Sequence, residues 1–395
     1  MLNNRHISFL TSLLCGMMLL MAVACSSSDD EEGQEGGVDK MPDKKPVMLA
    51  IYVYSPEREV ASARKGEVTR GDVGNVNSSQ DEGAIKSLQL WIYESTSGAY
   101  VGYLSTEEVS SLNKGEGITY QLPVSDEFAA AKPNVNVYVM ANVTTANCGV
   151  GTLDKETTRT DLLDGAKIAN GYFGLEQNTR IIPTDGLPFA GKLTAQPVVG
   201  DAPTLRIGTL SAVSTVQLTR AVSKMRFVFA KTTGQPTVNI TSIKMNAAMI
   251  PDEEYLFKTP VSMDYNTEAK ELLSTAISDI AETADPTQYL YLGQEAQEYE
   301  DLINEAASKA TPEVTVEGPV YLRESDKQLA GTITYTIDGG AEQTVDFAMQ
   351  QAGDFSRNHT WIVYAYYAGA GKLQVESLYI KDWSMKEINH DFYNW

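Results

Sequence analysis

The feature that most limits what this chain can fold into is a period-two hydrophobic pattern, recurring in short segments separated by glycine and proline. Residues 46–54 (PVMLAIYVY) form an unbroken apolar and aromatic run, which predicts a strand buried on both faces. Residues 85–95 alternate between apolar and polar side chains. The other segments that predict strands are 100–104, 118–124, 134–143, 204–210, 224–230, 237–247, 331–337, 344–350, 360–367 and 372–380. Many short strands at this spacing predict β-sandwiches.

One segment departs from this pattern. Residues 266–310 are rich in Ala, Glu and Leu, with Pro286 between the two halves, which predicts one or two surface helices. A chain of 395 residues is long enough for two domains. A turn-like stretch before a fresh strand pattern places the break near residues 200–216. We therefore expect a mainly β protein with domains at 46–212 and 213–383, the helical insert lying in the second.

The N-terminus predicts export. An apolar run after a basic start narrows to small residues directly before Cys25, which is typical of a signal segment rather than of the folded protein. The pattern resembles a bacterial lipobox, in which residues 1–24 are cut off between Ala24 and Cys25 and Cys25 carries lipid. A plain secretory signal and a transmembrane helix are the alternatives. Residues 25–45 are polar and acidic, which predicts a disordered tether. Serine and acidic residues directly after the cysteine resemble the surface-export signal of lipoproteins in Gram-negative gut and oral anaerobes.

Composition excludes several classes of function. A net charge of −21 and a pI near 4.6 argue against a nucleic-acid partner, because phosphates attract a basic surface. After the signal and Cys25, only Cys148 remains, so no disulfide within the mature chain is expected, and we expect this thiol to be inert. His359 and His390 are the only histidines beyond the signal, and they belong to no catalytic motif. Asp252-Glu253-Glu254 lacks the spacing of a calcium loop, which predicts solvated charge. We therefore expect no enzymatic activity, no cofactor and no bound metal ion.

Residues 216–229 (VQLTRAVSKMRFVF) carry a family resemblance: a strand, then Leu-x-Arg-Ala-x-x-Lys, then another strand. This resembles the hallmark of bacterial fimbrillins, the pilin subunits of Bacteroidales-type (type V) pili. The resemblance covers most of the chain from residue 47 onward in the family's order, and the insert at 266–310 matches least well. Its other stretches are 81–93, 137–143, 186–192, 355–367 and 375–383. It implies two transthyretin-like β-sandwich domains in tandem.

The resemblance also implies a life history. Such precursors reach the outer membrane as lipoproteins, and a trypsin-like protease cuts after an arginine in the loop that follows the first strand. We expect the cut between Arg70 and Gly71, which makes 46–70 the removable strand and loop. Arg58 and Arg64 are rival sites. Arg70-Gly71-Asp72 also spells a receptor-binding tripeptide, and Arg70 as an uncut, solvated loop charge is a further reading.

Removing a strand from a sandwich exposes apolar core and unpaired backbone groups, which a neighbour's strand restores by β-augmentation. The last residues of the chain are the candidate donor, although they also have the option of folding back onto their own domain. The candidate donor side chains are Leu378, Ile380, Trp383, Met385, Ile388, Phe392 and Trp395, the last four of them in the tail 384–395. In the LTRAVSK segment we expect Leu218 and Val222 to be buried and Arg220 and Lys224 to lie nearer the surface.

The sequence therefore predicts a structural subunit of an extracellular pilus that supports adhesion and matures from a lipid-anchored outer-membrane precursor. The expected partners are other pilin subunits, identical or of anchor and tip types, a trypsin-like maturation protease, and host glycans or proteins. Two alternatives are open. One is a monomeric surface lipoprotein that keeps its anchor and binds glycan or a host ligand. The other is an anchor or tip subunit of the same pilus.

Overall fold

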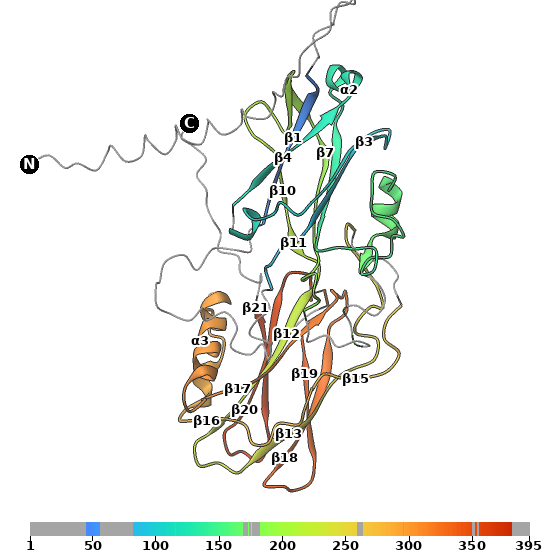
Figure 1. Cartoon of the computed structure of the whole chain (residues 1–395). Coiled ribbons are helices and arrows are strands. Elements are labelled where there is room, and N and C mark those ends of the chain that lie inside the picture. Colours follow the sequence, from blue (N-terminus) through green and yellow to red (C-terminus); the bar gives the residue numbers. More distant parts are fainter. Residues whose placement is uncertain are drawn as a thin grey trace, which may run out of the picture. The chain divides into compact units, whose positions relative to one another are not determined.

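The computed structural model describes residues 45–55, 82–114, 116–168, 173, 175, 182–258, 264–294, 296–349, 352–353 and 355–380. The described strands lie in one compact unit, Pro46–Trp395 (Figure 1). They form two pairs of sheets that follow one another along the chain, which confirms the mainly β prediction. None of the described helices is long and apolar enough to cross a membrane.

The first pair of sheets uses strands from the first 220 residues. One sheet consists of β1 (Val47–Tyr54), β4 (Ile118–Val124), β8 (Val198–Asp201), β9 (Thr204–Ile207) and β10 (Thr215–Gln217). The other consists of β2 (Leu88–Glu94), β3 (Tyr100–Thr106), β5 (Val135–Ala141), β7 (Phe189–Gln196) and β11 (Thr219–Arg220). Both sheets contribute to one hydrophobic core, because their alternate apolar side chains turn toward each other.

The second pair of sheets follows the same plan. Its larger sheet consists of β12 (Ser223–Thr232), β16 (Glu282–Thr283), β17 (Thr315–Leu322), β20 (Thr360–Tyr367) and β21 (Gln374–Ile380). The facing sheet consists of β13 (Val238–Met245), β15 (Lys270–Glu271), β18 (Ala330–Ile337) and β19 (Gln343–Ala348). A two-stranded ribbon joins β6 (Lys167–Ile168) to β14 (Glu254–Tyr255) and thus pairs segments 86 residues apart, as Ile168 opposite Glu254 shows.

The chain passes from the first sandwich to the second within residues 216–229, the segment that resembles the fimbrillin motif. β10 pairs with β1 in the first sheet, β11 pairs with β7 in the second sheet, and β12 opens the second sandwich. The change therefore falls between Arg220 and Ser223, 8 to 10 residues beyond the expected boundary at 212/213.

Helices are few in the described part of the chain. The short ones are η2 (Leu112–Lys114), α2 (Asp126–Ala131), η3 (Asp161–Gly165) and η4 (Pro286–Tyr289). The longest is α3 (Ala296–Ser308), which lies against the outer face of the β12–β20 sheet (Figure 1). Tyr299 and Ile303 of α3 are buried there against Tyr364 and Leu378. The predicted helical insert at 266–310 is thus helical mainly in its second half, because β15 and β16 take part in the sheets.

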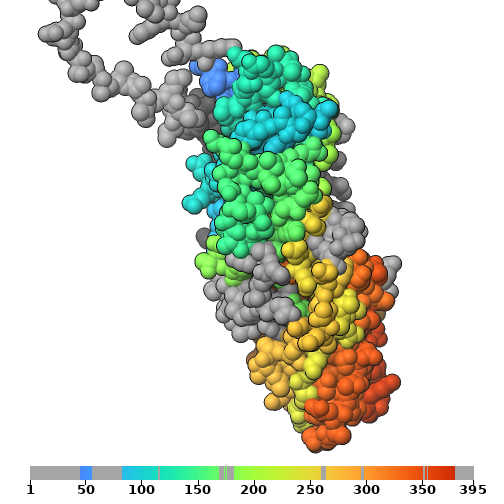
Figure 2. Space-filling model, turned by 90° about the vertical axis from the view of Figure 1, so that its right-hand side faces the viewer, coloured from blue at the N-terminus to red at the C-terminus, as the bar shows by residue number. Residues whose placement is uncertain are grey.

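The outer face of the β2–β3 sheet is also covered. Trp91, Tyr93 and Tyr103 donate hydrogen bonds to backbone carbonyls of residues 153–157 at 2.5–3.0 Å. These residues belong to the green segment at the surface of the first sandwich in Figure 2. Tyrosine at strand positions here therefore fixes a covering segment rather than forming an exposed aromatic platform.

Candidate functional site

Strand β1 is the feature around which the candidate site is built, because it lies in the interior of its sheet. Along one edge, residues 47–53 pair antiparallel with β4. Along the other edge, residues 48–50 pair parallel with β9 and residues 52–54 pair parallel with β10. The amide of Leu218 also donates to the carbonyl of Tyr54 at 2.8 Å. We call the position between β4 and the β9–β10 edge the β1 slot.

The side chains of β1 alternate between core and surface. Val47, Leu49, Ile51 and Val53 point into the first core and are 5%, 0%, 0% and 0% exposed. Residues 48, 50, 52 and 54 point outward and are half-buried. The prediction that this strand is buried on both faces is therefore wrong. The run looks continuous in sequence because its outward residues are Met, Ala and Tyr, which are themselves apolar or amphipathic.

The outward face of β1 carries one tight contact. A β-carbon added to Gly117, just before β4, would overlap the ring of Tyr52. The backbone of Gly117 is not left-handed, so glycine matters here because its lack of a side chain makes room for the ring. Tyr52 and Gly117 therefore form a second, outward point of fit between β1 and the neighbouring chain.

The predicted processing residues lie outside the described part of the chain. This applies to Ala24, Cys25, Arg70, Gly71 and the rival arginines. The two described residues on either side of the segment 56–81 are fixed points from which the positions of the arginines can be counted. Ser55 is 2% exposed at the end of β1, and Glu82 begins the next described stretch with a half-buried side chain. Arg70 lies 15 residues from Ser55 and 12 from Glu82, whereas Arg58 lies 3 residues from Ser55.

Glu82 is held by three side chains from the second half of the chain. Its carboxylate accepts from Lys224 Nζ at 3.1 Å and from the Tyr321 hydroxyl at 2.5 Å. Its backbone carbonyl accepts from Arg220 Nε at 3.1 Å. Burial acts to raise the pKa of Glu82, but Lys224, Arg220 and these hydrogen bonds outweigh burial and hold the pKa below its usual value. Glu82 is therefore a charged residue that fixes the chain in place directly after the segment 56–81.

The same cluster reaches helix α3. Lys224 Nζ lies 3.5 Å from the Glu300 carboxylate, which lies 3.6 Å from Arg226 NH1. Arg226 also donates to Asn304 Oδ1 at 3.0 Å. A row of buried charges thus links the residue that follows the segment 56–81 to the helix that covers the second sandwich.

The LTRAVSK expectations are half right. Leu218 and Val222 are 0% exposed, as predicted. Arg220 and Lys224 were expected nearer the surface, and this was wrong, because they are 3% and 7% exposed. Their charges are accommodated by Glu82, which lies 138 and 142 residues away in sequence. Glu82 and Tyr321 are the residues that sequence reasoning missed, and nothing local to either one marks them.

The candidate donor residues divide into two groups. Leu378 and Ile380 lie in β21, which pairs antiparallel with β20 along residues 374–380 of their own sheet. Leu378 is 8% exposed and packs in the cluster under α3. In the single chain the backbone of both residues is therefore paired within their own sheet, and their donation to a neighbour stays a prediction. Trp383, Met385, Ile388, Phe392 and Trp395 lie outside the described residues.

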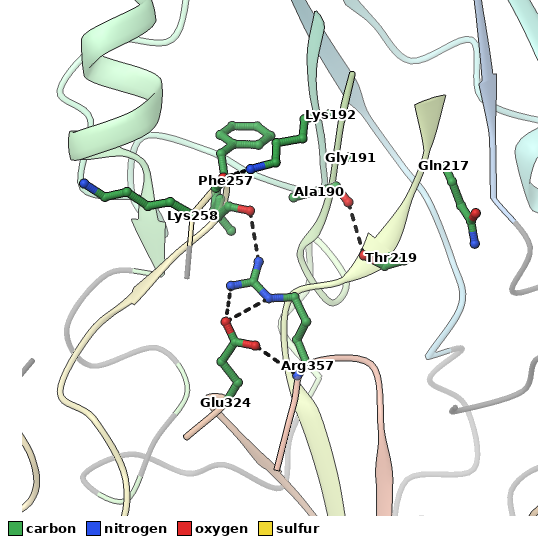
Figure 3. A pocket seen from close by; sticks show the side chains of 10 residues that line it. Ala190, Gly191, Lys192, Gln217, Thr219, Phe257, Lys258, Glu324 and Arg357 are labelled. Atoms are coloured by element: carbon green, nitrogen blue, oxygen red, sulfur yellow. Dashed lines mark hydrogen bonds and ion pairs between the residues drawn. The ribbon is translucent and has the colours of Figure 1, made fainter. Parts of the chain in front are cut away.

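A pocket of about 300 Å³ opens beside β7, β10 and β11 (Figure 3). Its charged side chains are occupied by other groups of the chain. Arg357 pairs with Glu324 at 2.5 Å, Lys192 donates to the Phe257 carbonyl at 2.5 Å, and Lys258 pairs with Asp164 at 2.5 Å. Gln217, which is exposed, also lines the pocket. The pocket therefore offers little uncommitted charge to a ligand.

Next to this pocket lies a buried carboxylate. Glu254 is 0% exposed and lies 3.1 Å from Arg357, so the prediction of solvated charge for this residue was wrong. Burial raises the pKa of Glu254 to about 8, with Arg357 opposing the rise. The contact between Arg357 and Glu254 links the loop before β20 to the β14 segment.

The candidate reactive residues lie in structural surroundings. Burial raises the pKa of the Cys148 thiol, which keeps it in the unreactive protonated form. His359 Nδ1 lies 2.9 Å from the Arg357 carbonyl and 3.0 Å from the Ser356 carbonyl, and His390 lies outside the described residues. Among the described residues, no three His, Cys, Asp or Glu side chains are grouped as metal ligands would be. The expectation that the chain is not an enzyme stays a prediction.

Comparisons with known proteins give matches among solved structures alone. No family model matches the chain, and no curated protein matches it. The tip fimbrial protein Mfa3 from Porphyromonas gingivalis is 12% identical with a TM-score of 0.48, covering 86% of this chain and 100% of that chain. A candidate cell adhesion protein from Bacteroides eggerthii is 13% identical with a TM-score of 0.44, covering 85% and 96%.

A third match is a fimbrial assembly protein from Parabacteroides distasonis, 10% identical with a TM-score of 0.42, covering 85% of this chain and 96% of that chain. Identities of 10–13% and TM-scores below 0.5 are too low to carry a functional assignment, which has to come from the chain's own residues.

Proposed function

We propose that this protein is a structural subunit of a surface pilus that is exported as a lipoprotein through Cys25, cut after Arg70 and joined to its neighbours by donor-strand exchange. The observation that carries the proposal is the position of β1. It is the first described strand, it lies between β4 and the β9–β10 edge, and its alternate side chains fill the first core.

Loss of β1 would leave a specific vacancy. Four inward side chains would leave the core, at roughly 1.5–3 kcal/mol each, or about 6–12 kcal/mol together. Both flanking edges would also expose unpaired N–H and C=O groups. A vacancy of this kind favours capture of another strand, which restores the core and the hydrogen bonds together.

The anchors at Ser55 and Glu82 support Arg70 as the cleavage site. A protease needs several extended residues on both sides of the bond that it cuts, and those residues must not be held in the fold. Arg58 lies 3 residues and Arg64 lies 9 residues from Ser55, whereas Arg70 lies at least 12 residues from either anchor. Glu82 would keep the start of β2 in place after the cut, because Arg220, Lys224 and Tyr321, which hold it, all lie after the cut in the chain.

The experiment compares the mature N-termini of the wild type and two variants. Protein shed from cells should have the intact mass of a chain that begins at Gly71. Arg70→Ala should keep the protein on the cell with Cys25 lipidated, while Arg64→Ala, the matched control, should be processed normally. Surface polymer that still contains residues 46–54 would count against the proposal. A pilus that starts at residue 65 would move the site to Arg64 without removing the mechanism.

A second candidate is a surface lipoprotein that keeps its anchor and binds glycan or a host ligand. The pocket beside β7 and β11 is the observation that favours it. We rank it second because Arg357, Lys192 and Lys258 are already engaged by groups of the chain itself. The same N-terminal measurement separates the two, since this candidate keeps lipidated Cys25 in the working protein.

A further inference from the structure

We propose that the strand which fills the β1 slot comes from a different kind of chain, not from the C-terminal tail of a second copy of this protein. The incoming strand should carry apolar side chains at four alternate inward positions, with an aromatic side chain facing outward between the third and the fourth. This inference rests on the proposed function, because it specifies the partner in the exchange.

The inward requirement follows from the neighbours of β1. Leu49 lies between Leu122 of β4 and Leu205 of β9 in register. Val53 lies between Ile118 of β4 and Val216 of β10. Leu122, Leu205 and Val216 are 2%, 1% and 0% exposed, so the positions between them are dry. A charged side chain at such a position would be buried without a partner and would cost several kcal/mol.

The outward requirement follows from Gly117. Because a β-carbon at Gly117 would overlap the Tyr52 ring, the ring occupies space that a side chain would otherwise take. An incoming strand with a small residue at this point would leave the space to water and lose the contact. The β1 slot therefore selects for particular side chains on both the inward and the outward face of the strand that enters it.

The tail of this chain does not meet the inward requirement. Four alternate positions span seven residues, and every such window within residues 374–395 puts at least one Asp, Glu, Lys or His at an inward position. The window that holds Ile388 and Phe392 puts His390 between them. The window that begins with Trp383 and Met385 continues with Glu387. Windows that begin at 381 or 382 put Lys381 or Asp382 inward, and windows that begin at 374–380 use residues of β21, which are already paired with β20.

A second copy therefore supplies no C-terminal strand with the pattern VxLxIYV that residues 47–53 have. Its own β1 has the pattern by definition, but on the proposed function that strand leaves with the cleaved fragment. The partner that remains is another type of subunit whose donor segment has four alternate Val, Ile or Leu residues and a Tyr, Phe or Trp. This assigns the chain a place beside a different subunit rather than in a homopolymer.

The test uses the exported chain after limited trypsin treatment, with intact mass confirming a cut after Arg70. A fluorescent peptide of residues 46–55 is allowed to exchange into the cut protein, and unlabelled peptides compete with it. The peptide 46–55 and its Tyr52→Ala form are compared with a tail peptide of residues 381–395. We expect the tail peptide to compete at least about 100-fold less well, at about tenfold for each inward position that lacks an apolar side chain.

The outcomes separate the two proposals. Equal competition by the tail peptide would overturn the inference while leaving strand exchange intact. Failure of the labelled 46–55 peptide to exchange under any condition that keeps the protein folded would overturn strand exchange, and the inference with it.

A matched pair of variants tests the outward position. Tyr52→Ala in the peptide should weaken competition roughly fivefold against the wild-type protein, because a half-buried ring contact is lost. In the Gly117→Ala protein this preference for tyrosine should shrink, while affinity for the Tyr52→Ala peptide stays unchanged. If the preference for tyrosine is the same in both proteins, Gly117 does not read the incoming strand.

Discussion

Leu49 is the position at which the role of β1 can be measured most directly. It is 0% exposed and lies in register between Leu122 and Leu205, so Leu49→Ala removes three side-chain carbons from the middle of the first core. Truncation of a fully buried leucine costs about 2–5 kcal/mol, since the lost transfer energy is joined by the cost of the cavity. We expect a loss of this size in the free energy of unfolding of the first sandwich in the uncut chain.

Met48→Ala is the matched control, because its side chain belongs to the same strand but points outward and is half-buried. It should cost less than about 1 kcal/mol. Urea titration followed by tryptophan fluorescence compares the two variants, with Trp91, buried under residues 153–157 in the same sandwich, as a reporter. Equal midpoints for Leu49→Ala and Met48→Ala would refute the alternation on which the β1 slot depends.

The same pair of variants tests exchange after cleavage. If the whole loss falls on the dissociation rate of the β1 fragment, Leu49→Ala should speed its release by roughly 30- to 4,000-fold. Met48→Ala should change the rate by less than about fivefold. The dissociation rate of the β1 fragment from each trypsin-cut variant is measured by size-exclusion chromatography over time. Fast release of the wild-type fragment, with the remaining chain still folded, would show that β1 contributes little to its sheet.

The other predictions concern the anchors, the motif and the tail. Leu218→Asp should cost several kcal/mol through a buried unpaired charge and abolish secretion of folded protein, and wild-type melting would contradict this. The pKa of Glu82 is lowered on folding, so its stabilisation is present above pH 4.5 and is lost as pH falls through the folded pKa; Glu82→Gln should lower the melting temperature at pH 7 and converge on the wild type in acid. Folding raises the pKa of Glu254 to about 8, so the free energy of unfolding of the wild type should fall as the pH rises from 4.5 to 8. In thermal melts, Glu254→Gln should make the melting temperature depend less on pH over this range. Deletion of residues 384–395 should leave the melting temperature nearly unchanged, because strands up to Ile380 already form both sheets of the second sandwich; an unfolded truncated chain would show that the tail packs on its own domain.

Sequence reasoning located most of the long strands because alternation is a local property. The run at 46–54 became β1 at Val47–Tyr54, and the run at 360–367 became β20 with the same bounds. Two of the longer strands were missed. β7 (Phe189–Gln196) has few apolar residues after its first two, and β17 (Thr315–Leu322) contains Gly318-Pro319, which reads as a turn. β7 and β17 are strands because they pair with β5 and β12, although their own residues do not alternate clearly.

The candidate site was predictable in part. The removable strand follows from its own residues together with the family resemblance. The burial of Arg220 and Lys224 does not follow, because both side chains bind Glu82, which is distant in sequence, and distant pairing of this kind leaves no periodic signal. The first half of the segment 266–310 was misread for a related reason. Its composition favours helix, but Lys270 and Glu271 pair with β13, and this tertiary pairing overrides local propensity.

The mixed pairing of β1 has a consequence for symmetry. β1 runs antiparallel to β4 and parallel to β9 and β10, so a strand that entered backwards would meet the wrong hydrogen-bond spacing along both edges at once. Only one direction of insertion preserves both ladders. A contact in which one molecule gives a strand and the next receives it in a fixed direction joins two different surfaces, so it cannot be a two-fold contact. An assembly built through this position would therefore have two unlike ends.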